Sequence, residues 1–134
     1  MVEVSNIIFC LETTTIDRGG INANNILSAL TPEYIPGLFT FSVIITILGV
    51  DIKVGHELKI EFISENDEIV VELESELPII ENPESNLPEQ YKGININMDW
   101  NNVNFKTSGL YNLKIYLDSK IIKQKSIYVK GKNE

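Results

Sequence analysis

The sequence is poor in the residue types that most often build reactive sites, with one cysteine, one histidine and one tryptophan in 134 residues. A lone cysteine, Cys10, excludes an internal disulfide framework. With a single histidine, His56, the chain also lacks the ligand set of a Cys/His zinc site. The sequence contains no glycine-rich phosphate-binding motif either. We therefore expect neither a cofactor nor a metal.

Positive charge is scarce, because 11 Lys and Arg stand against 19 Asp and Glu, which gives a net charge of −8. This balance argues against a surface for nucleic acid or anionic membranes. The most apolar run, residues 39–50, is shorter than the about 20 residues that a membrane-spanning helix needs. The first residues, 1–4, show no basic region of a secretory signal. We expect a cytoplasmic protein without a membrane partner.

The composition is 43% hydrophobic and 22% charged, which is typical of a globular domain. A length of 134 residues suits one domain, predicted over 1–134 with a frayed tail at 131–134. Short apolar or alternating segments recur at a spacing typical of an antiparallel β-sandwich. The expected strands lie at 4–11, 39–48, 57–64, 69–77, 94–100, 111–117 and 120–129, with turns at 12–25 and 51–56 and a long loop at 78–93.

Residues 26–30 fit either a short strand or one helical turn. We therefore predict an all-β antiparallel sandwich of seven to eight strands. The alternative is an α+β fold with one short helix near residues 21–30.

Several segments resemble a known fold family. The run GLYNLKIYLD at 109–118 is similar to the closing hairpin of immunoglobulin-like sandwiches. Together with Ile7–Leu11, the turn at Gly19–Ile21 and a strand ending at Gly49, it resembles a family of small uncharacterised bacterial and phage proteins, a domain of unknown function. The resemblance implies an immunoglobulin-like β-sandwich over most of the chain and a prophage or mobile-element setting. It implies no catalytic residues.

The row Glu72, Glu74 and Glu76 is the first candidate for chemistry, because alternate side chains on a strand lie about 6.5–7 Å apart. A glycosidase pair needs carboxyls about 5–9 Å apart in a cleft. A solvated strand face has the same spacing, and we favour that interpretation. The acidic segments at 65–68 and 81–86 lack the spacing of a calcium loop. Nothing in the sequence links Cys10 to His56 as a nucleophile and base.

Charge is unevenly distributed along the chain. Residues 57–89 hold 11 Asp and Glu with one Lys, a local −10, and residues 102–134 hold seven Lys with two acids, a local +5. The acidic segment could attract a basic partner at long range. Alternatively, the two segments could face each other across the sandwich and neutralise one another. We interpret the lysine-rich end as a basic edge that discourages strand pairing rather than as a nucleic-acid platform.

The favoured function is a non-enzymatic protein-binding module, encoded by a prophage or another mobile element, which docks a basic partner through an acidic strand and loop region. The candidate partner-binding residues are Glu65, Asp67, Glu68, Glu72, Glu74, Glu76, Glu81 and Glu84. One alternative is a small-molecule-binding, sugar-binding or hydrolytic sandwich that uses Glu72, Glu74 and Glu76. Another is a structural component of a phage or other assembly, for which a homo-oligomer formed through an edge strand is expected.

Overall fold

The computed structural model describes residues 2–16, 20–51, 53–77 and 87–133. These residues contain nine strands, one 3₁₀ turn (η2, Glu89–Tyr91) and no α-helix. The strands are β1 (Glu3–Thr15), β2 (Ile21–Ile26), β3 (Ala29–Leu30), β4 (Gly37–Leu48), β5 (His56–Ile63), β6 (Ile69–Leu77), β7 (Gly93–Phe105), β8 (Gly109–Leu117) and β9 (Lys120–Val129). The predicted all-β class is confirmed. No helix in the described part of the chain is long and apolar enough to cross a membrane.

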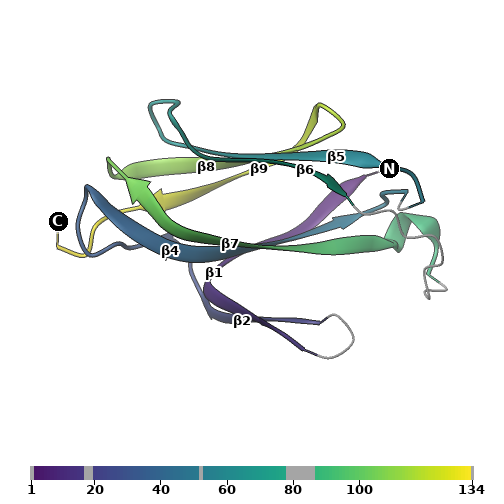
Figure 1. The fold of residues 1–134 in the computed structure, drawn as a ribbon, viewed down its shortest axis with the longest axis horizontal. Helices are drawn as coiled ribbons and strands as arrows, with labels where there is room; N and C mark the ends of the chain where they lie inside the picture. Colours follow the sequence, from purple (N-terminus) through teal and green to yellow (C-terminus); the bar gives the residue numbers. More distant parts are fainter. Residues whose placement is uncertain (1, 17–19, 52, 78–86, 134) are drawn as a thin grey trace.

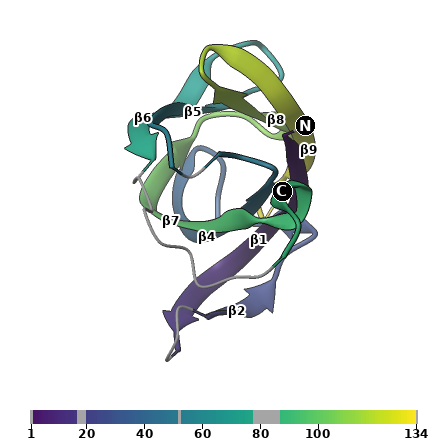
Figure 2. The same ribbon diagram turned by 90° about the vertical axis from the view of Figure 1, so that its right-hand side faces the viewer.

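The strands form two sheets that pack face to face (Figure 1). One sheet has four strands in the order β2-β1-β4-β7, and the other has five in the order β3-β9-β8-β5-β6. All neighbours are antiparallel except the short β3 and β9, which are parallel. In the end-on view, β6 and β7 lie along one side of the sandwich and β9 and β1 along the other (Figure 2).

The core consists of inward-facing side chains from both sheets. Alternation along β5 buries Leu58, Ile60 and Phe62, as the sequence predicts. The Phe62 ring lies 6.0 Å from Phe41 in β4, which belongs to the opposite sheet. Buried Tyr111 donates a hydrogen bond of 2.7 Å from its hydroxyl to the carbonyl of Thr107, so its polar end is satisfied.

The segment at 12–25, predicted as a turn, instead contains most of a hairpin. β1 continues to Thr15, and β2 begins at Ile21 and pairs with it. The alternative of a helix near 21–30 is wrong, because β2 and β3 occupy that segment. Three of the six residues of β2 (INANNI) are Asn, so its hydrophobic alternation is too weak to reveal it. Backbone pairing with β1 holds this segment as a strand. With β2 and β3 included, the described residues contain nine strands rather than the predicted seven to eight.

The predicted fraying of 131–134 does not hold for residues 131–133. The backbone N–H of Lys132 donates to the carbonyl of Pro32 at 2.8 Å. The side-chain Nδ2 of Asn133 donates to the carbonyl of Glu33, also at 2.8 Å. The end of the chain continues past the β3–β9 pair along the 32–35 segment, which supplies these acceptors; Glu134 lies outside the described residues.

The two charged segments do not face each other across the sandwich. Acidic β6 is one edge of the five-stranded sheet, whereas the lysine-rich β9 lies beyond β5 and β8, toward the other edge. In the described register, only Lys114 of the β8–β9 hairpin lies opposite an acidic residue of β5, which is Glu61. The charge separation along the sequence therefore becomes a separation across one sheet.

Candidate functional site

The acidic side chains of β5 and β6 gather on the outer face of the five-stranded sheet. Glu57 lies opposite Glu76, and Glu61 lies opposite Glu72. Residues directly opposite each other in an antiparallel pair project from the same face. We call Glu57, Glu61, Glu72, Glu74 and Glu76 the acidic face. Opposed carboxylates repel each other, so this arrangement costs stability unless cations compensate for it.

Lys59 supplies that compensation at the centre of the acidic face. Its ammonium lies 3.6 Å from a carboxylate oxygen of Glu72 and 3.9 Å from those of Glu61 and Glu74. It also lies 5.7 Å from the centre of the Tyr116 ring, within range of a cation–π contact. One internal cation is therefore shared by three carboxylates.

Tyr116 on β8 joins this group through its hydroxyl. The side chain of Glu61 is only 12% exposed and accepts a hydrogen bond from the Tyr116 hydroxyl. This hydrogen bond, followed by desolvation, raises the pKa of Tyr116 above its ordinary value. The hydrogen bond holds Glu61 in place as the most buried of the three carboxylates, whereas Glu72 and Glu74 lie on the more exposed strand β6.

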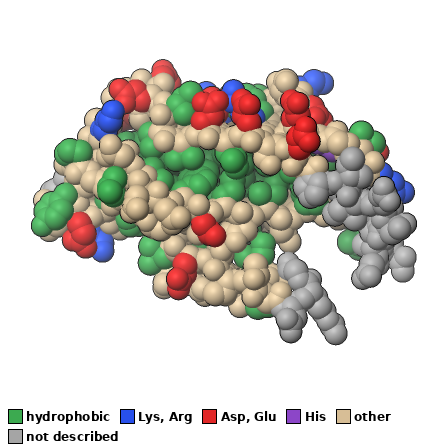
Figure 3. All heavy atoms as spheres, in the orientation of Figure 1, with side chains coloured by type: hydrophobic (Ala, Val, Ile, Leu, Met, Phe, Trp, Pro, Cys, Tyr) green, Lys and Arg blue, Asp and Glu red, His purple; other side chains and the backbone are tan. Residues whose placement is uncertain are grey.

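An open pocket of about 510 Å³ lies at one end of the acidic face. Its lining residues are Glu57, Leu58, Lys59, Glu74, Ser75, Glu76, Tyr116 and Ser119. Glu57 and Glu76 form no ion pair with any residue in the described ranges. Acidic side chains are visible along the upper sheet in the space-filling view (Figure 3). The pocket therefore combines carboxylates that lack an internal cation with an aromatic wall.

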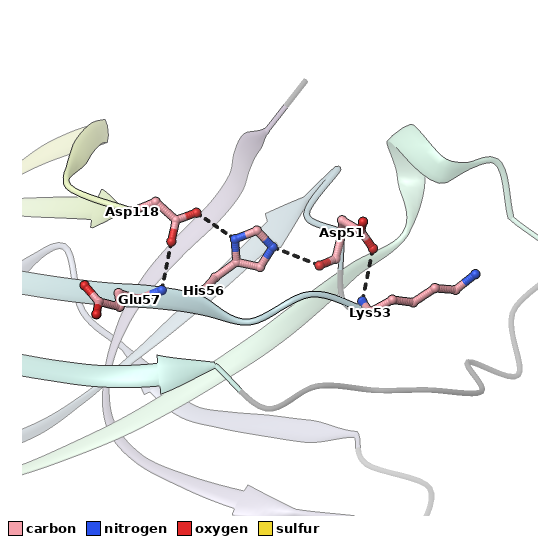
Figure 4. Close-up of polar contacts among 5 residues, drawn as sticks. All are labelled: Asp51, Lys53, His56, Glu57 and Asp118. Carbon is pink, nitrogen blue, oxygen red and sulfur yellow. Dashed lines mark hydrogen bonds and ion pairs between the residues drawn. The ribbon is translucent and has the colours of Figure 1, made fainter.

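His56 ties together the loops beside this pocket (Figure 4). Its Nδ1 lies 2.7 Å from a carboxylate oxygen of Asp118, and its Nε2 lies 2.8 Å from the backbone carbonyl oxygen of Asp51. Both neighbours only accept hydrogen bonds, so the two contacts are satisfied together when each ring nitrogen carries a proton. The other carboxylate oxygen of Asp118 accepts from the N–H of Glu57 at 2.9 Å. The β8–β9 turn is thus held against the start of β5.

We call the contacts of His56 with Asp118 and Asp51 the His56 clamp, and this clamp makes stability depend on pH. The Asp118 carboxylate raises the pKa of His56 above 6.5, and His56 lowers the pKa of Asp118 below 3.8. Stability from a raised histidine pKa is complete below 6.5 and is lost as pH rises through the folded pKa; that from a lowered aspartate pKa is complete above 3.8 and is lost as pH falls. We predict that Asp118→Asn destabilises most between about pH 4 and 6.5.

This prediction is checked by urea unfolding of both proteins across pH, together with proton NMR titration of His56, which is the one histidine of the sequence. The Asp118→Asn variant should bring the His56 pKa back toward 6.5. A His56 pKa at or below 6.5 in the unmodified protein would contradict the clamp.

The structure divides the predicted partner-binding residues. Glu72, Glu74 and Glu76 lie together on the acidic face. Glu65, Asp67 and Glu68 lie in the β5–β6 hairpin loop, at the end of β5 away from the pocket, where the N–H of Glu68 donates to the Ser64 hydroxyl. Glu81 and Glu84 lie outside the described residues.

Sequence reasoning missed the contributions of Glu57, Lys59, Glu61 and Tyr116. The alternation in 57–64 already assigns Lys59 and Glu61 to the polar face of a strand. Glu57 lies two positions before Lys59 in the same strand, so it projects from the same face. The signal that was lacking is the order of the strands, which places β5 between β6 and β8.

Cys10 and His56 do not meet in the fold. Cys10 is fully buried in β1 of the four-stranded sheet, where it pairs with Ser42 of β4. Burial raises the pKa of its thiol, which disfavours the thiolate. His56 begins β5 in the other sheet and uses both ring nitrogens in the clamp. The structure therefore places no nucleophile and base pair here.

Comparisons with known proteins give a family and two similar structures. The model of a family of unknown function (DUF6941) matches residues 6–130. No curated protein matches the sequence. An immunoglobulin-like protein from Pseudomonas aeruginosa is similar at 11% identity and a TM-score of 0.46, over 97% of each chain. A glycosyl hydrolase family 2 member from Bacteroides cellulosilyticus is similar at 13% identity and a TM-score of 0.49, over 73% of this chain.

The chain spans only 13% of the length of that hydrolase. The expected likeness to a domain family of unknown function is confirmed by the family match over residues 6–130.

Proposed function

Because the chain belongs to the DUF6941 family of unknown function, we propose its function from its own surface: a non-enzymatic binding module that docks a basic protein partner through the acidic face. The observation that carries the proposal is the pairing of β5 with β6, which opposes Glu57 to Glu76 and Glu61 to Glu72. Opposed carboxylates cost stability in the free protein. A partner's Lys or Arg side chains would relieve this repulsion on binding.

The distribution of charge supports a partner rather than an internal neutralisation. Lys59 contacts three of the five carboxylates, which leaves Glu57 and Glu76 without a cation among the described residues. The lysines of β9 are separated from β6 by two strands. A surface of one sign steers an oppositely charged partner and raises the association rate, most strongly at low salt.

The two alternative functions receive less support. A general acid needs a carboxyl enclosed in apolar surroundings, whereas the side chains of Glu72 and Glu74 are 43% and 70% exposed. A self-assembling structural component needs an edge strand open to pairing. β9 carries Lys123 opposite buried Ile115, so this lysine occupies an inward-facing position, which discourages strand addition.

The test is binding of a fluorescent oligolysine peptide to the protein and to the triple variant Glu72→Gln, Glu74→Gln, Glu76→Gln at low ionic strength. Three lost charge contacts at about 0.5 kcal/mol each predict about tenfold weaker binding. Affinity for the unmodified protein should also fall steeply with added salt.

The matched control neutralises three carboxylates elsewhere, with Glu3→Gln, Glu12→Gln and Glu33→Gln. Glu3 and Glu12 lie on β1 of the other sheet, so net charge changes equally while the acidic face stays intact. An equal loss of affinity in both triple variants would show that only net charge matters. That result, or no binding to the unmodified protein, would reject the proposal.

A further inference from the structure

β6 is an edge strand whose backbone is paired on one side only. It ends the order β3-β9-β8-β5-β6, and no other strand in the described ranges pairs with it. Its nine residues, IVVELESEL, alternate strictly from Val71 to Leu77 between inward and outward positions. An edge of this kind offers a row of backbone N–H and C=O groups to an added strand.

The inward positions of β6 from Val71 to Leu77 are apolar except for Ser75. Val71 lies opposite Phe62 and Leu73 opposite Ile60, and both partners are fully buried. On the facing edge, Ile94 and Ile96 of β7 are likewise inward and only partly buried. Hydrophobic side chains are visible between the two sheets on this side of the molecule (Figure 3). On the side of the sandwich where β6 and β7 form the sheet edges, Val71, Leu73, Ile94 and Ile96 therefore form an apolar strip below the acidic face.

The β9 and β7 edges differ from β6 in ways that disfavour a basic strand. On β9, Lys123 and Lys125 lie opposite Ile115 and Leu113, which are fully buried, so these lysines occupy inward positions that obstruct an added strand. β7 lacks the row of outward carboxylates that β6 carries, because its outward Asn95, Asn97 and Asp99 are hydrogen-bonded to Thr46, Thr13 and Ser42. From Val71 to Leu77, β6 has no charged side chain at an inward position.

We propose that the partner binds by strand addition to β6, as an extended segment in which basic and apolar residues alternate. This inference rests on the proposed function and adds how the partner segment is arranged on β6. Residues opposite Glu72, Glu74 and Glu76 would share the outer face with these carboxylates, so they are Lys or Arg. Residues between them face inward and cover the apolar strip beside Leu73 and Ile96. Backbone hydrogen bonds to β6 complete the interaction.

A second copy of the chain fits this edge poorly. Antiparallel pairing of β6 with another β6 would bring one row of glutamates beside the other, and opposed like charges are destabilising. The glutamate row thus discourages self-pairing while it favours a basic strand. Charge complementarity assigns the edge to a foreign basic segment.

The test compares three peptides of about nine residues, the length of β6. In the first, Lys and Val alternate; the second has the same composition with lysines and valines in separate blocks; the third is the first peptide with alternate N-methylated amides, which cannot pair with the edge. We expect the alternating peptide to bind at least about tenfold more tightly than either control. It alone should slow hydrogen exchange of β6 amides.

The same peptides are titrated into the Glu72→Gln, Glu74→Gln, Glu76→Gln variant. Equal binding of all three peptides, lost equally in the variant, would overturn strand addition and leave the proposed docking function standing. No binding by any peptide would overturn both. Self-association of the protein that protects the same β6 amides would identify a second copy as the occupant and overturn the proposal.

Discussion

Replacing Phe62 with alanine is expected to lower the free energy of unfolding by about 3–5 kcal/mol, because it removes a fully buried ring and leaves a cavity. Phe62 lies in β5, at the centre of the aromatic cluster that joins the two sheets. Its ring centre lies within 6.3 Å of those of Phe9, Phe41, Trp100, Phe105 and Tyr111. Both layers of the sandwich therefore lose contacts in this variant.

Urea unfolding measures the loss, and Leu110→Ala is the matched control. Leu110 lies on β8 of the same sheet but is 48% exposed, so its truncation should cost less than about 1 kcal/mol. A Phe62→Ala variant within about 1 kcal/mol of the unmodified protein would show that the two sheets do not share this core.

Replacing Lys59 with methionine is expected to change stability and binding in opposite directions. The variant removes Lys59, the one cation among the described residues that contacts Glu61, Glu72 and Glu74, and Glu61 is largely buried. We expect a loss of about 1–2 kcal/mol in the free energy of unfolding. Affinity for oligolysine should rise severalfold, because an incoming ammonium can take the vacated position beside Tyr116.

Chemical denaturation and peptide titration at low salt measure the two effects, with Lys114→Met as the control. Lys114 lies opposite Glu61 on β8 but forms no ion pair with a described residue, so its loss should be mild in both assays. Weaker or unchanged peptide binding by Lys59→Met would show that Lys59 does not compete with a cationic ligand.

The strands that could be predicted from the sequence are those in which apolar residues alternate with polar ones because one face is buried. The alternation in 69–77 places Val71, Leu73 and Leu77 on the opposite face from Glu72, Glu74 and Glu76, and the register confirms this. The segment 120–129 coincides with β9. In such strands one face is buried, so hydrophobic periodicity carries the register.

Elements stabilised mainly by backbone pairing could not be predicted in the same way. Half of the residues of β2 are Asn, and the 131–133 segment is held by hydrogen bonds to Pro32 and Glu33, so neither has a clear apolar pattern to detect. The acidic face required the strand order, because the sequence does not state that β5 separates β6 from β8. The His56 clamp joins His56 at the start of β5 to Asp118 in the β8–β9 turn, 62 positions later, and no local sequence pattern indicates this contact.

The most direct test of the account is an NMR map of the alternating Lys–Val peptide on the isotopically labelled protein. The account predicts chemical-shift changes concentrated in β6, at Lys59 and at Tyr116, together with new protection of the β6 amides. Changes centred on β9 or on the sheet of β1, β4 and β7, or a titration without localised changes, would contradict it.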